Sequence, residues 1–428
     1  MMSYKKKVLI ITYYWPPAGG SGVQRWLKFS KYLRDFEIEP VIYTVENPSY
    51  PILDNSLENE IPKELEILKQ PIFEPNSILS VFSGKKKESA GFLNPNPTFI
   101  GKTLQYIRAN YFIPDTRKFW IKPSVKFLSA YLNDNHIDAI ITTGPPHSMH
   151  LIGLELKKKL GIKWISDFRD PWTEIDYFQQ LPLTKKATKK HQDLEQEVLI
   201  NSDMVVVVGE TMKDKFLKHT NRIEVLTNGF DTIEDLSTQK LDEKFSITHV
   251  GLMNSDRNPT ILWEVLNEIS NTNLNFKNDL RIKLIGKLDD AVIQDLKVFD
   301  HNTIETIPYL DHKDVGKYQA SSQILLLSIN EVPSAKGIIT GKIFEYLQAK
   351  RPILAIGPED GDAAMILKNT NAGTIVGFKN KTALKATILN LYKDYKEGVL
   401  FVKSVNIEQY HRKNITSQLA EVIKKVVS

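Results

Sequence analysis

The sequence predicts an α/β protein that consists of two Rossmann-like domains facing each other across a cleft. The chain has 428 residues, whereas domains cluster near roughly 100–200 residues, so two domains of similar size are expected. Short β-branched runs alternate with segments of helical spacing, which is typical of parallel sheets covered by helices. A polar, acidic segment at 231–244 interrupts this alternation, which then restarts, and we interpret it as the linker.

The N-terminal domain is predicted at residues 1–230. It opens with a strand at 8–12, a glycine turn, a helix at 23–33 and a strand at 41–45. The stretch 47–97 lacks periodicity and is too long for a simple connection, which indicates an elaborated surface region facing a substrate. Later strands, with a helix at 148–160, are expected at 139–143, 163–167, 204–208 and 223–226.

The C-terminal domain is predicted at residues 231–404, and a final helix at 405–428 is expected to pack back on the first domain. Ligands of such sheets bind outside the carboxyl ends of the strands, so the loops at these ends should line the cleft. The strands are expected at 246–250, 282–286, 323–328 and 352–356, and the helices at 259–269 and 341–349.

Composition excludes several classes of protein. The sequence has no cysteine, which rules out disulfides, thiolate nucleophiles and cysteine-ligated metals. The formal charge of +5 is modest for this length and does not indicate a nucleic-acid partner. Lysines cluster at 5–7, 85–87, 157–159 and 185–190; they are either solvated helix ends or a face that attracts anionic lipid or a phosphate-bearing acceptor.

The expected location is cytoplasmic. The short apolar run near the N-terminus lacks a small-residue cleavage site, which argues against a signal peptide. No segment approaches the roughly 20 apolar residues that span a bilayer. Together with the lysine clusters, this leaves open peripheral docking at the inner face of the plasma membrane.

Candidate site residues of the first domain follow its strands. Gly19, Gly20 and Gly22 lie between the first strand and helix, as either a tight turn or a contact for phosphate or an anionic acceptor. His147 could hydrogen-bond a sugar hydroxyl at the cleft. The segment Asp167-Phe168-Arg169-Asp170-Pro171-Trp172 offers carboxylates for sugar hydroxyls and an indole face for a sugar ring, although Arg169 could simply pair with the aspartates.

In the second domain, Gly251 follows a strand, and Arg257 lies a few residues on. Lys342 and Glu345 are three apart on the helix that begins near Gly341, and taken alone they are an ordinary helical salt pair. Cations at 257 and 342 could instead neutralise a diphosphate leaving group, and a glutamate could hold ribose hydroxyls.

Three further patterns of polar residues have alternative interpretations. His147 and His150 have helical spacing but no evident third metal ligand, and Asp360 and Asp362 lie in a domain that already offers positive charge, so no metal site is expected. Asp115, in a patch with Arg117 and Trp120, is interpreted equally well as a helix cap.

Taken together, these segments resemble glycosyltransferase family 4, a retaining family with the GT-B fold. The resemblance extends in order over nearly the whole chain. Its motifs are Tyr14-Trp15-Pro16-Pro17 with the glycines at 19–22, Gly144-Pro145-Pro146-His147-Ser148, the segment 167–172, Thr227-Asn228-Gly229-Phe230-Asp231, Gly251 with Arg257, the helix at 341–347, and Arg351-Pro352-Ile353-Leu354.

The resemblance implies a nucleotide-sugar donor as substrate, no cofactor and no metal. It implies that Arg257 and Lys342 hold the donor diphosphate and Glu345 the ribose, with Gly251 and Gly341 beside them. His147, Asp167 and Asp170 would border the transferred sugar. The acceptor would be a glycan or a polyprenyl-phosphate-linked saccharide of a bacterial envelope polysaccharide pathway.

The sequence departs from the family pattern at two places. Gly337 stands eight residues before Glu345, where the family often has a glutamate, and Asn258-Pro259 replaces a frequent lysine. These departures keep two alternatives open: a nucleotide-sugar epimerase of the same fold, which needs no acceptor, and a non-catalytic protein that binds a sugar or nucleotide.

Overall fold

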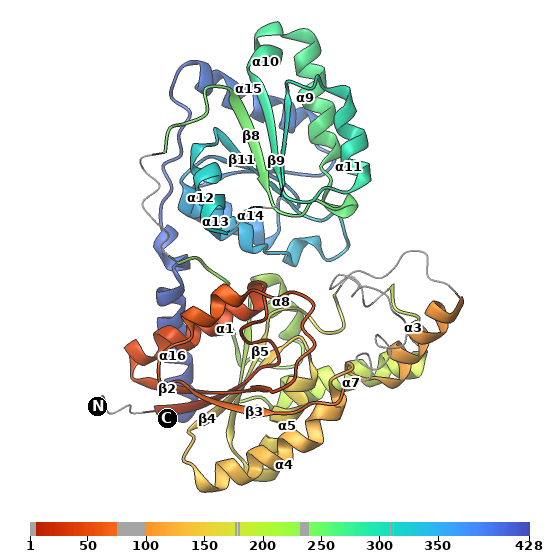
Figure 1. The fold of residues 1–428 in the computed structure, drawn as a ribbon, viewed down its shortest axis with the longest axis vertical. Coiled ribbons are helices and arrows are strands. Elements are labelled where there is room, and N and C mark those ends of the chain that lie inside the picture. Colours follow the sequence, from red (N-terminus) through yellow and green to blue (C-terminus); the bar gives the residue numbers. More distant parts are fainter. Residues whose placement is uncertain are drawn as a thin grey trace. The chain divides into compact units, whose positions relative to one another are not determined.

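The computed structural model describes residues 6–74, 99–175, 178, 180–231, 239–308, 310 and 312–428. The chain forms two compact units (Figure 1): unit 1 comprises Met1–Asn228 and Arg412–Ser428, and unit 2 comprises Gly229–His411. Lys5, the lysines at 85–87, the later part of the predicted elaborated region and half of the predicted linker lie outside the described residues.

Unit 1 contains a parallel sheet of seven strands in the order β3-β2-β1-β4-β5-β6-β7. Its central strands are rich in Val and Ile, and β4 is buried along its whole length, as expected for a sheet covered on both faces. The strands are β1 (Lys6–Ile11), β2 (Ile38–Val45), β3 (Glu66–Gln70), β4 (Ala139–Gly144), β5 (Lys163–Phe168), β6 (Met204–Val207) and β7 (Ile223–Val225).

The helices of unit 1 include the last helix of the chain, which packs against α1. This helix begins at Arg412, later than the predicted 405, and it buries Ile415, Leu419 and Ile423, which are spaced by four and so share one face. Residues 405–411 belong to unit 2. The helices are α1 (Ser21–Tyr32), α3 (Phe99–Tyr111), α4 (Lys118–Asp134), α5 (Ser148–Leu160), α7 (Lys185–Asn201), α8 (Glu210–Phe216) and α16 (Arg412–Val427).

Unit 2 repeats the architecture with six parallel strands in the order β10-β9-β8-β11-β12-β13. The strands are β8 (Phe245–Val250), β9 (Leu280–Ile285), β10 (Ile304–Ile307), β11 (Ile324–Ser328), β12 (Ile353–Ile356) and β13 (Gly373–Val376). The helices are α9 (Thr260–Thr272), α10 (Leu274–Asp279), α11 (Asp290–Asp295), α12 (His312–Ser321), α13 (Gly341–Ala349), α14 (Asp362–Thr370) and α15 (Lys381–Lys396).

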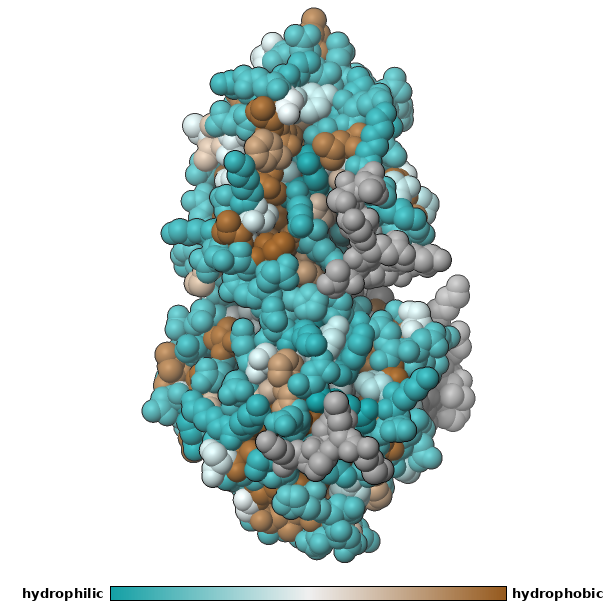
Figure 2. All heavy atoms as spheres, turned by 90° about the vertical axis from the view of Figure 1, so that its left-hand side faces the viewer, coloured by the Kyte–Doolittle hydropathy of each residue, from teal (hydrophilic) through white to brown (hydrophobic). Residues whose placement is uncertain are grey.

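These observations confirm the predicted fold class of two Rossmann-like α/β domains. Each unit has its own apolar core on its own sheet. Figure 2 shows one face of the molecule, on which hydrophilic side chains predominate and apolar ones are scattered, as is usual for folded proteins. Within the described part of the chain, every helix is too short or too polar to cross a bilayer.

Candidate functional site

The most informative polar cluster lies at the carboxyl end of β8 in unit 2. This strand leads into Gly251, whose φ of +100° favours glycine. A Cβ added to Gly251 would lie 3.0 Å from the Nζ atom of Lys342, the second residue of α13. Gly251 and Lys342, which were predicted from separate motifs, are therefore in contact, and the missing side chain at 251 makes room for the lysine.

Lys342 interacts with a buried histidine of β8. Its Nζ atom lies 3.2 Å from His249 Nε2, and His249 Nδ1 lies 3.2 Å from the carbonyl oxygen of Leu326. A carbonyl oxygen can only accept, so Nδ1 carries the hydrogen and Nε2 accepts from Lys342. Burial, and then the charge of Lys342, hold the pKa of His249 well below its usual range, so the imidazole is neutral.

Arg257 is held by neutral groups. Its Nε donates to Asn330 Oδ1 at 3.0 Å, and its Nη1 donates to the carbonyl oxygen of Leu252 at 3.3 Å. Burial, and then the charge of Arg257, lower the pKa of Lys342, which is about 7 after the smaller opposing effect of Glu345. Across the described ranges, no carboxylate forms an ion pair with Arg257 or Lys342. The cluster therefore holds two cationic side chains, and Glu345 on the same helix acts on Lys342 in the opposite direction, to raise its pKa.

The start of α13 is open to a ligand. The helix begins at Gly341, where an added Cβ would meet nothing within 4 Å, and the N-cap residue Thr340 makes no side-chain capping bond. Uncapped N–H groups at a helix start favour an anion. Glu345, one turn on, accepts a hydrogen bond from Gln319 Nε2 at 3.2 Å, so Lys342 contacts β8 while Glu345 contacts α12.

The remaining acidic candidates of unit 2 have other partners. Asp360 pairs with Lys336, next to Gly337, and Asp362 is buried at the start of α14. Among the residues that the structure describes, no group of three or more His, Cys, Asp or Glu side chains could hold a metal ion.

In unit 1, His147 lies at the carboxyl end of β4 and is 6% exposed. Its ring is parallel to that of Trp172, with centroids 4.8 Å apart, and within the described residues neither ring nitrogen has a hydrogen-bond partner. Burial, and then the charge of His150, lower its pKa well below the usual value. His147 is thus a neutral imidazole, and both of its ring nitrogens are buried in this structure.

Trp172 is 2% exposed, which corrects the expectation that it offers an open indole face to a sugar. His147 occupies one face of the ring, and the indole Nε1 donates to His191 Nδ1 at 3.0 Å. Its backbone N–H donates to Glu195 at 3.1 Å. The physical reason is that the imidazole of His147 stacks on the indole face that a sugar ring would otherwise contact. Trp172 therefore orients His147.

Asp167 lies in the interior of unit 1 and is 1% exposed. Its carboxylate pairs with Arg25 of α1 at 2.8 Å and accepts from Trp26 Nε1 at 2.8 Å and from Thr143 Oγ1 at 2.9 Å. Asp170 is exposed at the surface, yet burial by the protein atoms around it acts to raise the pKa of its carboxyl more than the charge of Arg169 lowers it. The two aspartates that the sequence grouped in one cluster therefore have different surroundings, and Asp167 ties α1 to the sheet.

Arg169 lies against the glycine loop. A Cβ added to Gly22 would lie 1.6 Å from Arg169 Nη1, and Arg169 also donates to the carbonyl oxygen of Pro145. Gly20 has a φ of +104° at the N-cap of α1, and Gly19 donates its N–H to Ile52 at 3.0 Å. The loop is thus both a turn and a place where a guanidinium lies over the first turn of a helix.

Asp115 contacts the starts of two helices, and its carboxylate accepts from the backbone N–H of Arg117, the N-cap residue of α4, at 2.8 Å. Its carboxylate accepts from the backbone N–H of Ser148 at 2.9 Å and from Ser148 Oγ at 2.8 Å, and so caps α5. Arg117 pairs with Glu74 at 3.1 Å, and Trp120 is fully buried. The contacts of Asp115 with Ser148 stabilise the start of α5, directly after His147.

No family model and no curated protein matches the sequence. Among solved structures, HepE of Anabaena in complex with UDP-glucose matches with a TM-score of 0.59 and 12% identity over 98% of this chain and 99% of that chain. TarM, known from S. aureus, matches with a TM-score of 0.61 and 14% identity over 98% and 99% of the two chains. The fold is GT-B. A protein assigned as UDP-N-acetylglucosamine 2-epimerase of Listeria monocytogenes has the same fold, with a TM-score of 0.55 and 13% identity over 98% and 96%.

Two residues that shape these clusters, His249 and Arg25, were not predicted from the sequence. His249 was assigned only to an apolar strand, and the single signal was a histidine two positions before a glycine that ends the strand. Arg25 lies within the predicted first helix, and its partner Asp167 is 142 residues away in the chain. Only the folded chain brings these pairs together.

Proposed function

We propose that this protein is a metal-independent, retaining glycosyltransferase of family 4 that transfers a sugar from a nucleotide-sugar donor. One observation carries the proposal: Arg257 and Lys342 lie near the open start of α13 with only neutral hydrogen-bond partners. Buried or partly buried cations without carboxylates are costly unless a ligand supplies the anion. A diphosphate is the group whose charge and size fit two cations and a helix N-terminus.

The same groups can stabilise the transition state. As the bond between sugar and diphosphate breaks, negative charge grows on the leaving phosphate, where the cations at 257 and 342 and the N–H groups from Gly341 onward attract it most strongly. Gly251 leaves room for this group, and Glu345 is proposed to hold the ribose hydroxyls. In a retaining transfer the acceptor hydroxyl attacks from the side of the leaving group and passes its proton to the departing phosphate, so no carboxylate nucleophile is needed.

Unit 1 is proposed to supply the acceptor side. His147 offers two unused ring nitrogens for sugar hydroxyls, and Arg169 with the glycines at 19–22 offers positive charge for an anionic group such as the phosphate of a polyprenyl-linked acceptor. Asp170 is exposed and available to a hydroxyl. An envelope polysaccharide pathway is proposed from the family resemblance.

Thermal unfolding with nucleoside diphosphates and nucleotide sugars tests donor binding. A ligand that binds only the native state stabilises it by about 2.7 kcal/mol at a concentration 100-fold above Kd, so the melting temperature is expected to rise with the correct diphosphate and little with the monophosphate. Absence of a shift with every nucleoside diphosphate would contradict the proposal. Incubation with donor alone then separates the alternatives, because an epimerase changes the sugar without an acceptor.

The proposed lipid-linked acceptor suggests where unit 1 meets a membrane. Residues 99–134, from α3 to the end of α4, contain six Lys or Arg residues, of which Arg117 pairs with Glu74, and two carboxylates, Asp134 and Asp115, the latter of which caps α5. Leu104, Ile107 and Tyr111 are 44%, 41% and 66% exposed, and their spacing puts them on one face of α3. An apolar face beside excess positive charge matches an anionic bilayer.

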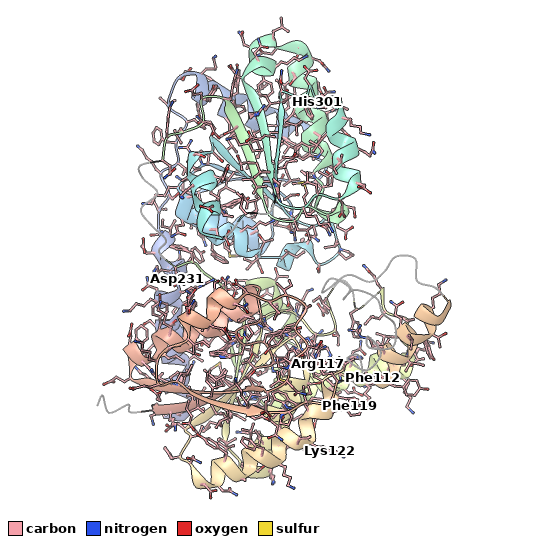
Figure 3. All side chains as sticks on the ribbon, viewed as in Figure 1. Phe112, Arg117, Phe119, Lys122, Asp231 and His301 are labelled. Atoms are coloured by element: carbon pink, nitrogen blue, oxygen red, sulfur yellow. The ribbon has the colours of Figure 1, made fainter. Side chains whose placement is uncertain are left out.

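Neighbouring helices extend this surface. Lys118 lies over the rings of Phe112 and Phe119 at 5.4 and 5.3 Å, and both aromatic residues lie on the same side of unit 1 as Lys122 (Figure 3). Burial, and then the charge of Lys190 on α7, lower the pKa of Lys118, which indicates that the lysines of α4 and α7 converge. We propose that α3, α4 and the start of α7 form a membrane-docking surface.

Flotation with vesicles tests this surface. The wild-type protein is expected to float with phosphatidylglycerol vesicles at low salt and much less with purely zwitterionic ones. A variant with Ile107→Ser and Tyr111→Ser should lose most of this binding. Leu274→Ser is the matched control, since Leu274 is 75% exposed on α10 of unit 2. Equal flotation of the two variants would show that α3 does not dock.

A further inference from the structure

We infer that His249 is a positioning residue for the donor diphosphate: it directs the Lys342 ammonium group toward the ligand without neutralising it. This inference rests on the proposed function and deepens it. His249 is 0% exposed on a central strand, and burying a polar imidazole at such a position costs free energy of folding.

Both ring nitrogens of His249 are used, and each has a fixed role. Nδ1–H donates to the carbonyl oxygen of Leu326 on the adjacent strand β11, which leaves the lone pair of Nε2 directed at Lys342. Tyr346 of α13 donates to the same carbonyl at 3.3 Å and accepts from the Val250 N–H at 3.2 Å. Contacts from β8, β11 and α13 thereby fix the imidazole in one tautomer and one orientation.

The choice of an imidazole matters for the charge of the site. An aspartate or glutamate at this position would also accept from Lys342, but its charge would cancel that of the ammonium group and repel a diphosphate. An apolar side chain would leave the ammonium group undirected. A buried neutral imidazole orients one N–H of the protonated Lys342 and leaves the other two N–H groups, and the positive charge of that form, for an anion.

The charged groups around Lys342 support the same conclusion. Burial is the largest cause of the lowered pKa of Lys342. Arg257, on the segment after β8, also lowers this pKa, and Glu345, on α13 with Lys342, raises it by a smaller amount, so that the pKa is about 7. Near neutral pH the free protein therefore holds Lys342 partly deprotonated. A bound diphosphate favours the charged form, so donor binding should take up a proton as pH rises above 7.

The sign of the pH dependence follows from this proton. Below the pKa of Lys342 in the free protein, the ammonium group is already charged and affinity is constant. Above it, binding includes protonation, so Kd for a diphosphate diester such as UDP-glucose is expected to rise about tenfold per pH unit until the pKa of the bound state is reached. UDP-glucose is a suitable probe because its diphosphate does not titrate near neutrality.

Two amide substitutions of different side-chain length distinguish a role of His249 in positioning Lys342 from a role in folding. In His249→Gln the side-chain amide reaches the position of Nε2 and can still accept from Lys342, whereas in His249→Asn it reaches only the position of Nδ1. We expect His249→Asn to weaken UDP-glucose binding at pH 6.5 by about tenfold or more, the usual effect of losing a hydrogen bond to a charged group, and His249→Gln to restore most of it. Unfolding temperatures of both variants are measured in parallel.

A second measurement needs no ligand. Trace acetylation followed by mass spectrometry gives the pH at which Lys342 becomes reactive. Loss of the acceptor disfavours the ammonium form, so the midpoint should fall in His249→Asn and stay near that of wild type in His249→Gln. Equal midpoints in all three proteins would overturn the inference about His249 even if UDP-glucose binds. A wild-type midpoint near 7 with no binding of any nucleoside diphosphate would overturn the proposed function and leave the His249–Lys342 contact in place.

Discussion

Replacing Lys342 with methionine is expected to lower kcat/KM for donor consumption by about 100- to 1,000-fold, the usual effect of removing one group that stabilises developing charge. Methionine has a similar length and fills the space beside Gly251, so the change removes charge and little volume. The fold should persist, because the lysine forms no ion pair within the described residues and its partner is a neutral histidine.

The measurement is a donor-turnover assay with the acceptor that the transferase uses, together with the unfolding temperature of each variant. Lys368→Met is the matched control, since Lys368 is an exposed lysine of α14 in the same unit. Turnover of Lys342→Met within a few fold of the control would mean that the positive charge at this position does not act on the leaving group. Loss of turnover with an unchanged unfolding temperature supports the assignment.

The elements that the sequence predicted well are those with strong, uniform patterns. The helices predicted at 148–160 and 341–349 agree with α5 and α13 at both ends, and the central strands lie where the apolar runs predict them. The missed strands β3, β10 and β13 are all at the edges of their sheets and are only partly buried. An edge strand needs fewer apolar residues, so its sequence resembles a loop.

The candidate site was predictable to the extent that its residues lie in recognisable loops. Gly251 and Lys342 follow a strand and begin a helix, and the structure brings them together. The roles of Asp167 and Trp172 were not predictable, because they depend on Arg25 and His147 occupying the positions that a ligand would otherwise take. The sequence gives the chemical nature of each side chain and its place along the chain, but it does not show which distant side chains contact it in the folded protein.

Replacing Asp167 with alanine is expected to destabilise unit 1 by about 3–5 kcal/mol, the usual cost of removing one partner of a buried ion pair. The change would leave the Arg25 guanidinium uncompensated, and it would also remove the acceptor for Trp26 and Thr143. Urea unfolding at neutral pH measures the loss. A double variant with Arg25→Met and Asp167→Leu should recover part of it, since the isolated charge is gone.

Acid sensitivity tests the same carboxylate independently. Burial acts to raise the pKa of Asp167, but the charge and hydrogen bonds of Arg25 outweigh it and the net shift is downward. A carboxyl whose pKa is lower in the folded state stabilises the protein above its unfolded pKa, near 3.8, and this contribution is lost as pH falls through the folded value. Wild type should therefore lose stability over that acidic range more steeply than a stably folded Arg25→Met, Asp167→Leu variant. Asp170→Ala should be at least as stable as wild type at neutral pH, because the pKa of Asp170 is raised in the folded protein, and it should lose turnover if Asp170 contacts the sugar. A variant of Asp167 that is stable but inactive would show that Asp167 acts in catalysis and is not only a structural residue.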